Sequence, residues 1–216
     1  MFGDKILKSY TGKIILINIV IFTLSMILSS IFGEIFFEYV ALKPNTIFSG
    51  QNLWTLITSM FFHGGLAHLF ANMFSLFFIG MFLERLVGKK RFLGLYLISG
   101  LFASIFYVSL SFLFGNSLIG SRLFGNPSGL ALGASGAIFG LLGLLAVLTP
   151  KNRIYLIAGP LIAIVSQAVL SNFFVGSFMN VIDLLIMFYT FFSLFVVITF
   201  NRRLRKWALP LEMTFW

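Results

Sequence analysis

The polar residues best suited to chemistry in this sequence stand in two otherwise apolar stretches. His68 and Asn72 are four positions apart, so on a helix they share one face and can aim two hydrogen-bond donors at one point. Two donors aimed in this way can stabilise a developing oxyanion. An interhelical hydrogen bond would account for the same pair equally well, because polar side chains in apolar helices usually face other helices.

A serine within a glycine-rich run supplies a possible nucleophile. Ser135 stands in Gly133-Ala134-Ser135-Gly136 at the start of an apolar stretch, and a serine hydroxyl becomes a nucleophile when a neighbouring base takes its proton. The alternative is structural. The glycines of this run continue as a stripe through Gly140 and Gly143, and small-residue stripes commonly serve close helix packing.

Other kinds of catalytic chemistry match the sequence poorly. A zinc protease needs H-E-x-x-H, but His63 and His68 are the only histidines and no acidic residue lies between them. An aspartyl protease needs two carboxylates, and Asp183 is the only Asp in an apolar stretch. Without cysteine there is no thiol nucleophile or thiolate site. Glu84 and Asp183 fall near the ends of apolar stretches, which argues against ion-coupled transport. We therefore expect no metal and no organic cofactor.

The composition indicates that lipid is the solvent. Hydrophobic residues make up 59% of the 216 residues and charged residues 10%, and the mean hydropathy of +1.04 lies outside the range of water-soluble domains. The net charge of +9 comes from short clusters between apolar stretches, which favours anionic lipid headgroups over nucleic acid as a partner. We predict one membrane domain over residues 1–216, in a multi-pass protein of the cell membrane.

Apolar runs of about 20 residues, each able to cross a roughly 30 Å hydrocarbon core as a helix, predict an all-α bundle of six transmembrane helices. The expected spans are 13–33, 66–83, 92–114, 130–148, 154–172 and 180–200. Residues 34–62 mix charges, Pro44 and aromatic side chains, which is typical of an interfacial or re-entrant loop. All Lys and Arg except Lys43 and Arg122 then fall on one side of the membrane, which predicts that both termini are cytoplasmic.

The order and spacing of these motifs resemble the rhomboid family of intramembrane serine proteases and their inactive relatives. The resemblance covers most of the chain. It rests on Trp54 in a long first loop, H-G-G-x-x-H-L-x-x-N-M starting at His63, the Glu84-Arg85 pair followed by Gly88, and G-A-S-G-A-I-F-G around Ser135.

The resemblance implies a role for each of these residues. Ser135 would be the nucleophile, held in its motif by Gly133 and Gly136, and His68 and Asn72 would stabilise the oxyanion with the Ser135 backbone N–H. The early part of the 34–62 loop would be embedded in lipid beside the active site, and Glu84 and Arg85 would make structural contacts at the cytoplasmic end of the second span. Transmembrane helices would be the substrates or clients.

The last expected span departs from the family pattern at the general base. Active rhomboids carry A-H-x-x-G there, whereas this chain reads Asn180-Val-Ile-Asp183, so Asp183 stands where the histidine should be. A carboxylate is a weaker base than imidazole, and losing the base of a serine protease can cost roughly 10⁶ in kcat. Two functions stay open. One is a serine endopeptidase that uses Asp183 or a displaced His68 as its base, and the other is a pseudoprotease that binds or escorts transmembrane clients.

Overall fold

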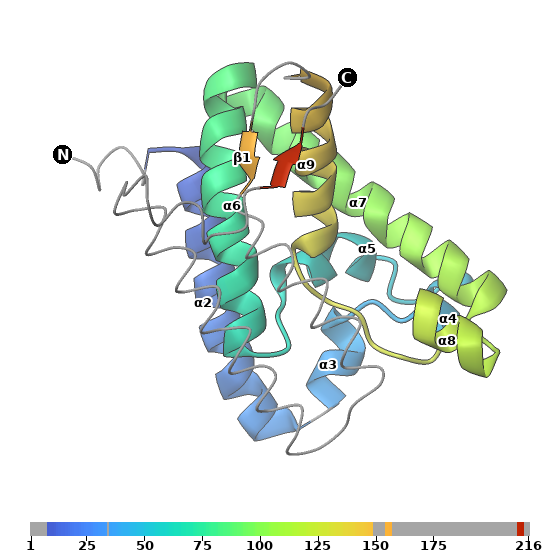
Figure 1. The fold of residues 1–216 in the computed structure, drawn as a ribbon. Helices are drawn as coiled ribbons and strands as arrows, with labels where there is room; N and C mark the ends of the chain where they lie inside the picture. The colour runs from blue at the N-terminus through green and yellow to red at the C-terminus, as the bar shows by residue number, and fades with distance from the viewer. Residues whose placement is uncertain (1–7, 34, 149–153, 157–210, 214–216) are drawn as a thin grey trace.

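Long apolar helices make up most of the fold. The structure is a computed structural model that describes residues 8–33, 35–148, 154–156 and 211–213. In this part of the chain, three helices are long and apolar enough to cross a membrane. They are α2 (Tyr10–Phe32), α6 (Leu66–Val87) and α7 (Lys89–Phe114), and a shorter apolar helix, α9 (Ser135–Leu148), lies against them (Figure 1). The short elements are α3 (Ile35–Val40), α4 (Pro44–Phe48), α5 (Thr55–Thr58), the 3-10 helix η1 (Ser59–Phe61), α8 (Leu118–Phe124), β1 (Ile154–Leu156) and β2 (Leu211–Met213).

The helices expected at the first three spans are confirmed, but the expected start of the fourth span at Leu130 is wrong. Helix α9 begins at Ser135. Ala131 forms an antiparallel bridge with Leu42, and Gly133 has a φ of +126°, which a helix cannot accommodate. The residues before Ser135 are therefore an extended approach to the helix rather than its first turn.

The expected fifth and sixth spans, with Asp183, lie outside the described residues except for β1. Strand β1 pairs antiparallel with β2, with Tyr155 opposite Glu212. Apart from these two short strands, the described part of the chain is mostly helical, as expected, and Ile154, the expected start of the fifth span, stands in β1. A β-branched residue followed by an aromatic one suits a strand, and the pairing satisfies backbone groups that a helix would satisfy internally.

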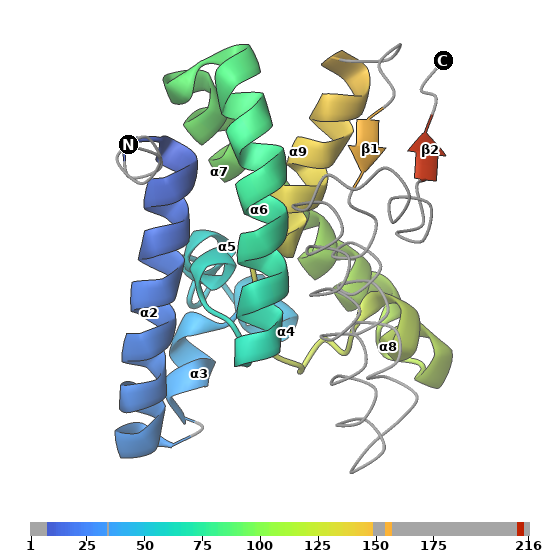
Figure 2. The ribbon, with the colours of Figure 1, turned by 60° about the vertical axis from the view of Figure 1, so that its left-hand side comes forward.

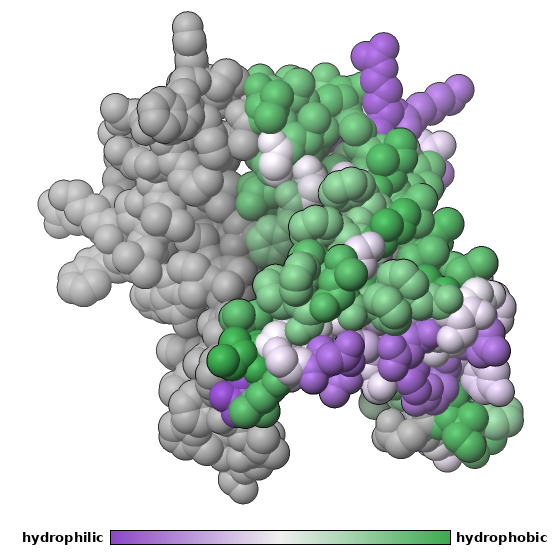
Figure 3. Space-filling view, turned by 90° about the vertical axis from the view of Figure 1, so that its right-hand side faces the viewer, coloured by the Kyte–Doolittle hydropathy of each residue, from purple (hydrophilic) through white to green (hydrophobic). Residues whose placement is uncertain are grey.

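Helix α6 is the centre of the described bundle. It lies between α2 and α9 (Figure 2) and also contacts α7. Half of its most apolar window is buried, compared with 22% for α2 and 17% for α7. The largest fully buried hydrophobic side chains come from α6, α7 and α9: Leu76, Leu83, Phe92, Tyr96, Ile138 and Leu141. Helices α2 and α7 consequently leave large apolar surfaces uncovered in the described part, as helices in contact with lipid do. Figure 3 shows the face of the molecule on the side of α7, and much of it is apolar.

Glu84 fixes the start of α2 against α6. Its side chain is only 6% exposed, and its carboxylate accepts hydrogen bonds from the Tyr10 N–H at 2.9 Å, the Thr11 N–H at 2.8 Å and the Thr11 hydroxyl at 2.7 Å. The first N–H groups of a helix have no partner within the helix, so a buried carboxylate there satisfies them and suits the helix dipole. The contact expected of Glu84 from the family resemblance is therefore present, whereas Arg85 beside it is exposed.

Candidate active site

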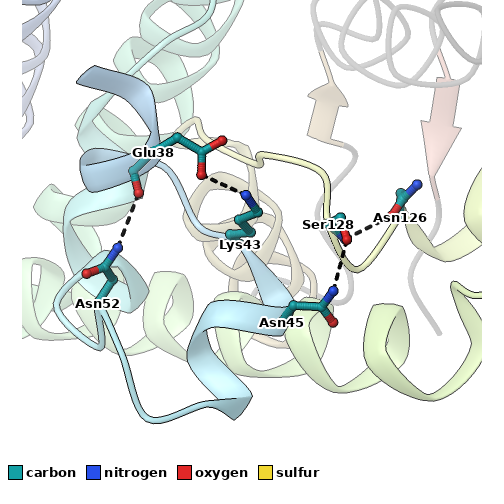
Figure 4. Close-up of polar contacts among 6 residues, drawn as sticks. All are labelled: Glu38, Lys43, Asn45, Asn52, Asn126 and Ser128. Atoms are coloured by element: carbon teal, nitrogen blue, oxygen red, sulfur yellow. Dashed lines mark hydrogen bonds and ion pairs between the residues drawn. The ribbon is translucent and has the colours of Figure 1, made fainter. Parts of the chain in front are cut away.

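The approach to Ser135 is tied to the first loop by backbone and side-chain hydrogen bonds. Leu42 and Ala131 exchange two backbone bonds, both 2.8 Å long. Asn45 donates its N–H to the Pro127 carbonyl at 2.9 Å, and its side-chain Nδ2 donates to Ser128 Oγ at 2.9 Å (Figure 4). The position of the segment entering α9 is therefore set by a loop more than 80 residues earlier in the chain.

The loop that carries these bonds is braced internally. Lys43 forms an ion pair with Glu38 at 2.7 Å, and the Asn52 side chain donates to the Glu38 carbonyl at 3.2 Å (Figure 4). Trp54 donates its indole N–H to the Tyr39 carbonyl at 2.9 Å. The two short helices α3 and α4 are thus held to one another and to the following turn. The segment that leads into Ser135 is therefore bonded to a loop with several internal contacts.

Gly133 brings the approach segment against the polar pair of α6. Its N–H donates to the Ser59 carbonyl at 3.0 Å, and its φ of +126° is one that residues with a Cβ rarely adopt. A Cβ at this position would lie 2.7 Å from His68 Cε1, 2.8 Å from His68 Nε2 and 3.9 Å from Asn72 Nδ2. The edge of the imidazole therefore rests directly on the backbone two residues before Ser135, in space that only glycine leaves free.

His68 and Asn72 share one face of α6, as their spacing predicts. The Asn72 Nδ2 donates to the His68 carbonyl at 2.9 Å within the same helix, and Asn72 is fully buried. Among the described residues, its Oδ1 has no hydrogen-bond partner. The hydrogen bond that the structure gives to Asn72 is not interhelical, so it does not support the structural alternative. A second amide N–H remains for a ligand beside Gly133.

Ser135 occupies the first position of α9 and lines a cavity of about 250 Å³. Its own side chain is half-buried. The polar wall of the cavity also includes Ser59, Ser104 and Tyr107. Because Ser135 begins a helix, its N–H belongs to the group that finds no carbonyl within the helix, and such N–H groups favour negative charge. Among the described residues, His68 and Asn72 do not line this cavity, and Gly133 is the residue that both lines it and meets the His68 ring.

His63 is a buried neighbour of the site to which the sequence assigned no role. Its side chain is 1% exposed, and its ring meets the His68 ring edge-on at a centroid distance of 5.2 Å. Burial, together with the nearby His68, lowers the pKa of His63 to about 3, so it is neutral near pH 7. Its place in H-G-G-x-x-H, five residues before His68, was the signal available in the sequence.

Part of the small-residue stripe of α9 packs on α7, as the structural alternative predicted. A Cβ on Gly136 would lie 2.6 Å from Ala103 Cβ, and one on Gly140 would lie 2.6 Å from Ser99 Oγ. A Cβ on Gly143 would meet nothing within 4 Å in the described part of the chain. Packing and chemistry are therefore compatible uses of the same helix, since Ser135 and Gly136 line the cavity while Gly136 and Gly140 meet α7.

The structure thus brings His68 and Asn72 of α6 beside Gly133, two residues before Ser135 at the start of α9. Asp183, at the position expected for the base, lies outside the described residues. Comparison with known proteins shows the family, because the Rhomboid domain family matches residues 50–203. The chain belongs to the rhomboid family. Rhomboids are intramembrane serine proteases, and the family includes inactive members.

The relatives that the chain resembles include a protein named as a protease and a protein named as inactive. The chain is 43% identical to RHOMBOID-like protein 1 of Arabidopsis thaliana over 103 residues, which is 48% of this chain and 23% of that protein. It is 38% identical to Rhomboid protease GluP of Bacillus subtilis (strain 168) over 111 residues, 51% of this chain and 19% of that protein. It is 32% identical to Inactive RHOMBOID-like protein 8 of Arabidopsis thaliana over 134 residues, 62% of this chain and 34% of that protein.

These relatives are matched over only a part of their own length. The matched segment is 23%, 19% and 34% of the three relatives, well under two thirds in each case. No solved structure matches the chain.

Proposed function

We propose that this chain is a serine endopeptidase of the rhomboid type that acts slowly on transmembrane segments of membrane proteins. Ser135 is the nucleophile, held between Gly133 and Gly136, and His68 and Asn72 stabilise the oxyanion. The observation that carries the proposal is the contact of the His68 ring with Gly133, two residues before Ser135. Asp183 replaces the usual histidine base, and the weaker base is the reason for the slow rate.

The second candidate is a non-catalytic rhomboid-like protein that binds or escorts transmembrane clients. Asp183 favours it, because a carboxylate must both accept the serine proton and return one to the leaving amine. The same pocket serves this function without a bond-breaking step. Both candidates share their partners, which are transmembrane helices and membrane lipids rather than nucleic acid.

Labelling of Ser135 with a fluorophosphonate probe tests the proposal. We expect weak labelling of the full chain in detergent, because the hydroxyl lacks an imidazole base, and no labelling of Ser135→Ala. Rapid and saturable labelling of the wild type would contradict the assignment of a weak base. Labelling that persists in Ser135→Ala would remove Ser135 as the nucleophile. A complete absence of labelling, together with photo-crosslinking of a transmembrane peptide to the pocket, would favour the second candidate.

The arrangement in the membrane is part of this proposal. We propose a single domain of six spans over residues 1–216 in the cell membrane, with both termini in the cytoplasm, on the strength of the Lys and Arg distribution. Reporter fusions at Trp216 are expected to report a cytoplasmic C-terminus, and a reporter inserted at Asn116 an extracytoplasmic loop. A C-terminus outside the cell would contradict the six-span arrangement.

A further inference from the structure

Basic side chains from three elements gather at one end of the molecule. The members are exposed and come from the entry to α2, the end of α6 and the start of α7: Lys8, Lys13, Arg85, Lys89, Lys90 and Arg91. We call them the basic cluster. Helix α6 ends and α7 begins at the top of Figure 1, and at this level Figure 3 shows hydrophilic side chains standing above a broad apolar surface.

One hydrogen bond joins two members of the basic cluster directly. The Lys89 Nζ donates to the Lys8 carbonyl at 2.9 Å, which joins the entry of α2 to the first turn of α7. The Lys13 Nζ lies 5.2 Å from the centroid of the Tyr10 ring on the same turn of α2. Glu84 holds this turn against α6, so all three elements are fixed relative to one another.

The cluster lacks a carboxylate partner in the described part of the chain. Glu84 is the acidic residue nearest in the fold, but it is buried and its oxygens already accept bonds from Tyr10 and Thr11. Glu38 pairs with Lys43 in the first loop, at the opposite end of α2. Lys89, Lys90 and Arg91 also occupy the first turn of α7, where the helix dipole opposes positive charge. Several cations without a carboxylate partner at one end of the fold create a positive potential that attracts an anion.

We propose that the basic cluster binds the phosphate headgroups of anionic phospholipids at the membrane surface where α6 ends and α7 begins. The surface just below the cluster is apolar. Leu16 of α2 is 49% exposed and Ile98 of α7 is 66% exposed, within three turns of the start of each helix. An anionic lipid can place its headgroup on the cations and its acyl chains on these side chains, whereas a soluble phosphate uses only the first of the two contacts.

Titration of lipids into the detergent-solubilised full chain tests the proposal, with retained lipid counted by native mass spectrometry and stability followed by thermal unfolding. Phosphatidylglycerol is expected to be retained and to raise the unfolding midpoint, and phosphatidylcholine is not. A variant carrying Lys89→Gln, Lys90→Gln and Arg91→Gln is expected to bind phosphatidylglycerol roughly 100-fold more weakly, because each basic side chain near an anionic surface contributes about a fivefold gain. Lys43→Gln, at the other end, is the matched control and is expected to bind as the wild type does.

Several results would overturn the proposal. Equal retention of the two lipids would show that charge does not select the lipid. An equal rise of the unfolding midpoint with inorganic phosphate would show that the cluster takes a soluble anion instead. If the triple variant does not fold, salt titration of the wild type decides, because a surface charge interaction weakens over a few hundred millimolar salt. Retention of phosphatidylglycerol that is insensitive to salt would then count against the basic cluster. None of these measurements depends on proteolysis.

Discussion

Asp183→His is expected to raise cleavage of a helix-destabilised transmembrane substrate by roughly 100-fold or more, since a positioned general base contributes about 10²–10⁴-fold. Asp183 occupies the place of the family's histidine by resemblance, and the proposed oxyanion donors lie close to the segment that leads into Ser135. His68 and Asn72 meet the backbone before Ser135, and Phe139 follows one turn later on α9, where an aromatic ring can support an imidazole. Cleavage by the purified chain in proteoliposomes, together with probe labelling of Ser135, measures the effect.

Packing is the main obstacle to that gain. Ile186 stands where the family carries a small residue after its histidine, and an error near 1 Å in the position of a catalytic group can cost about 100-fold. The combined variant Asp183→His and Ile186→Gly removes this obstacle and is expected to be at least as active as the single variant. If both variants fold and neither cleaves nor reacts with the probe, the proposed register of the last span is wrong. If Asp183→Ala abolishes cleavage and Asp183→His adds nothing, Asp183 is itself a competent base.

The long helices could be predicted from sequence because their signal is local. An apolar run of about 20 residues has few alternatives to a helix in lipid, which must satisfy its own backbone groups. Helices α2, α6 and α7 follow from this rule alone. The start of α9 does not, because Leu130 and its neighbours are equally apolar in the sequence. Their conformation depends on the bridge between Leu42 and Ala131, a contact between distant segments that hydropathy does not record.

The site shows the same division between local and distant information. The pairing of His68 with Asn72 could be predicted, because four residues on a helix return to the same face. The role of Gly133 could not, since the need for a missing Cβ arises from the position of the His68 ring on another helix. The glycine stripe of α9 also depends on contacts that the sequence does not record. Its sequence does not distinguish Gly140, which meets Ser99 of α7, from Gly143, which meets nothing in the described part.

Gly140→Ala is expected to destabilise the chain by about 1–3 kcal/mol, the usual cost of forcing a methyl group into a packed interface. The added Cβ would lie 2.6 Å from Ser99 Oγ and also collide with Ser99 Cβ, so α9 and α7 must separate. Because Ser135 is the first residue of α9, such a shift also moves this proposed nucleophile relative to His68. The expected results are a lower midpoint of thermal unfolding in detergent and weaker probe labelling of Ser135.

Ser99→Gly tests whether that effect comes from the contact itself. On its own this substitution is expected to destabilise α7 modestly, by about 0.5–1 kcal/mol, because glycine is a poorer helix former than serine. Combined with Gly140→Ala, it removes the atoms that the new methyl group strikes, so the double variant should recover most of the loss in a double-mutant cycle. Gly94→Ala on α7, where a Cβ would meet nothing within 4 Å of the described residues, is the matched control and should leave the midpoint unchanged or slightly higher. Additive effects of Ser99→Gly and Gly140→Ala, or a loss in Gly94→Ala equal to that in Gly140→Ala, would contradict close packing of α9 on α7 as the device that positions Ser135.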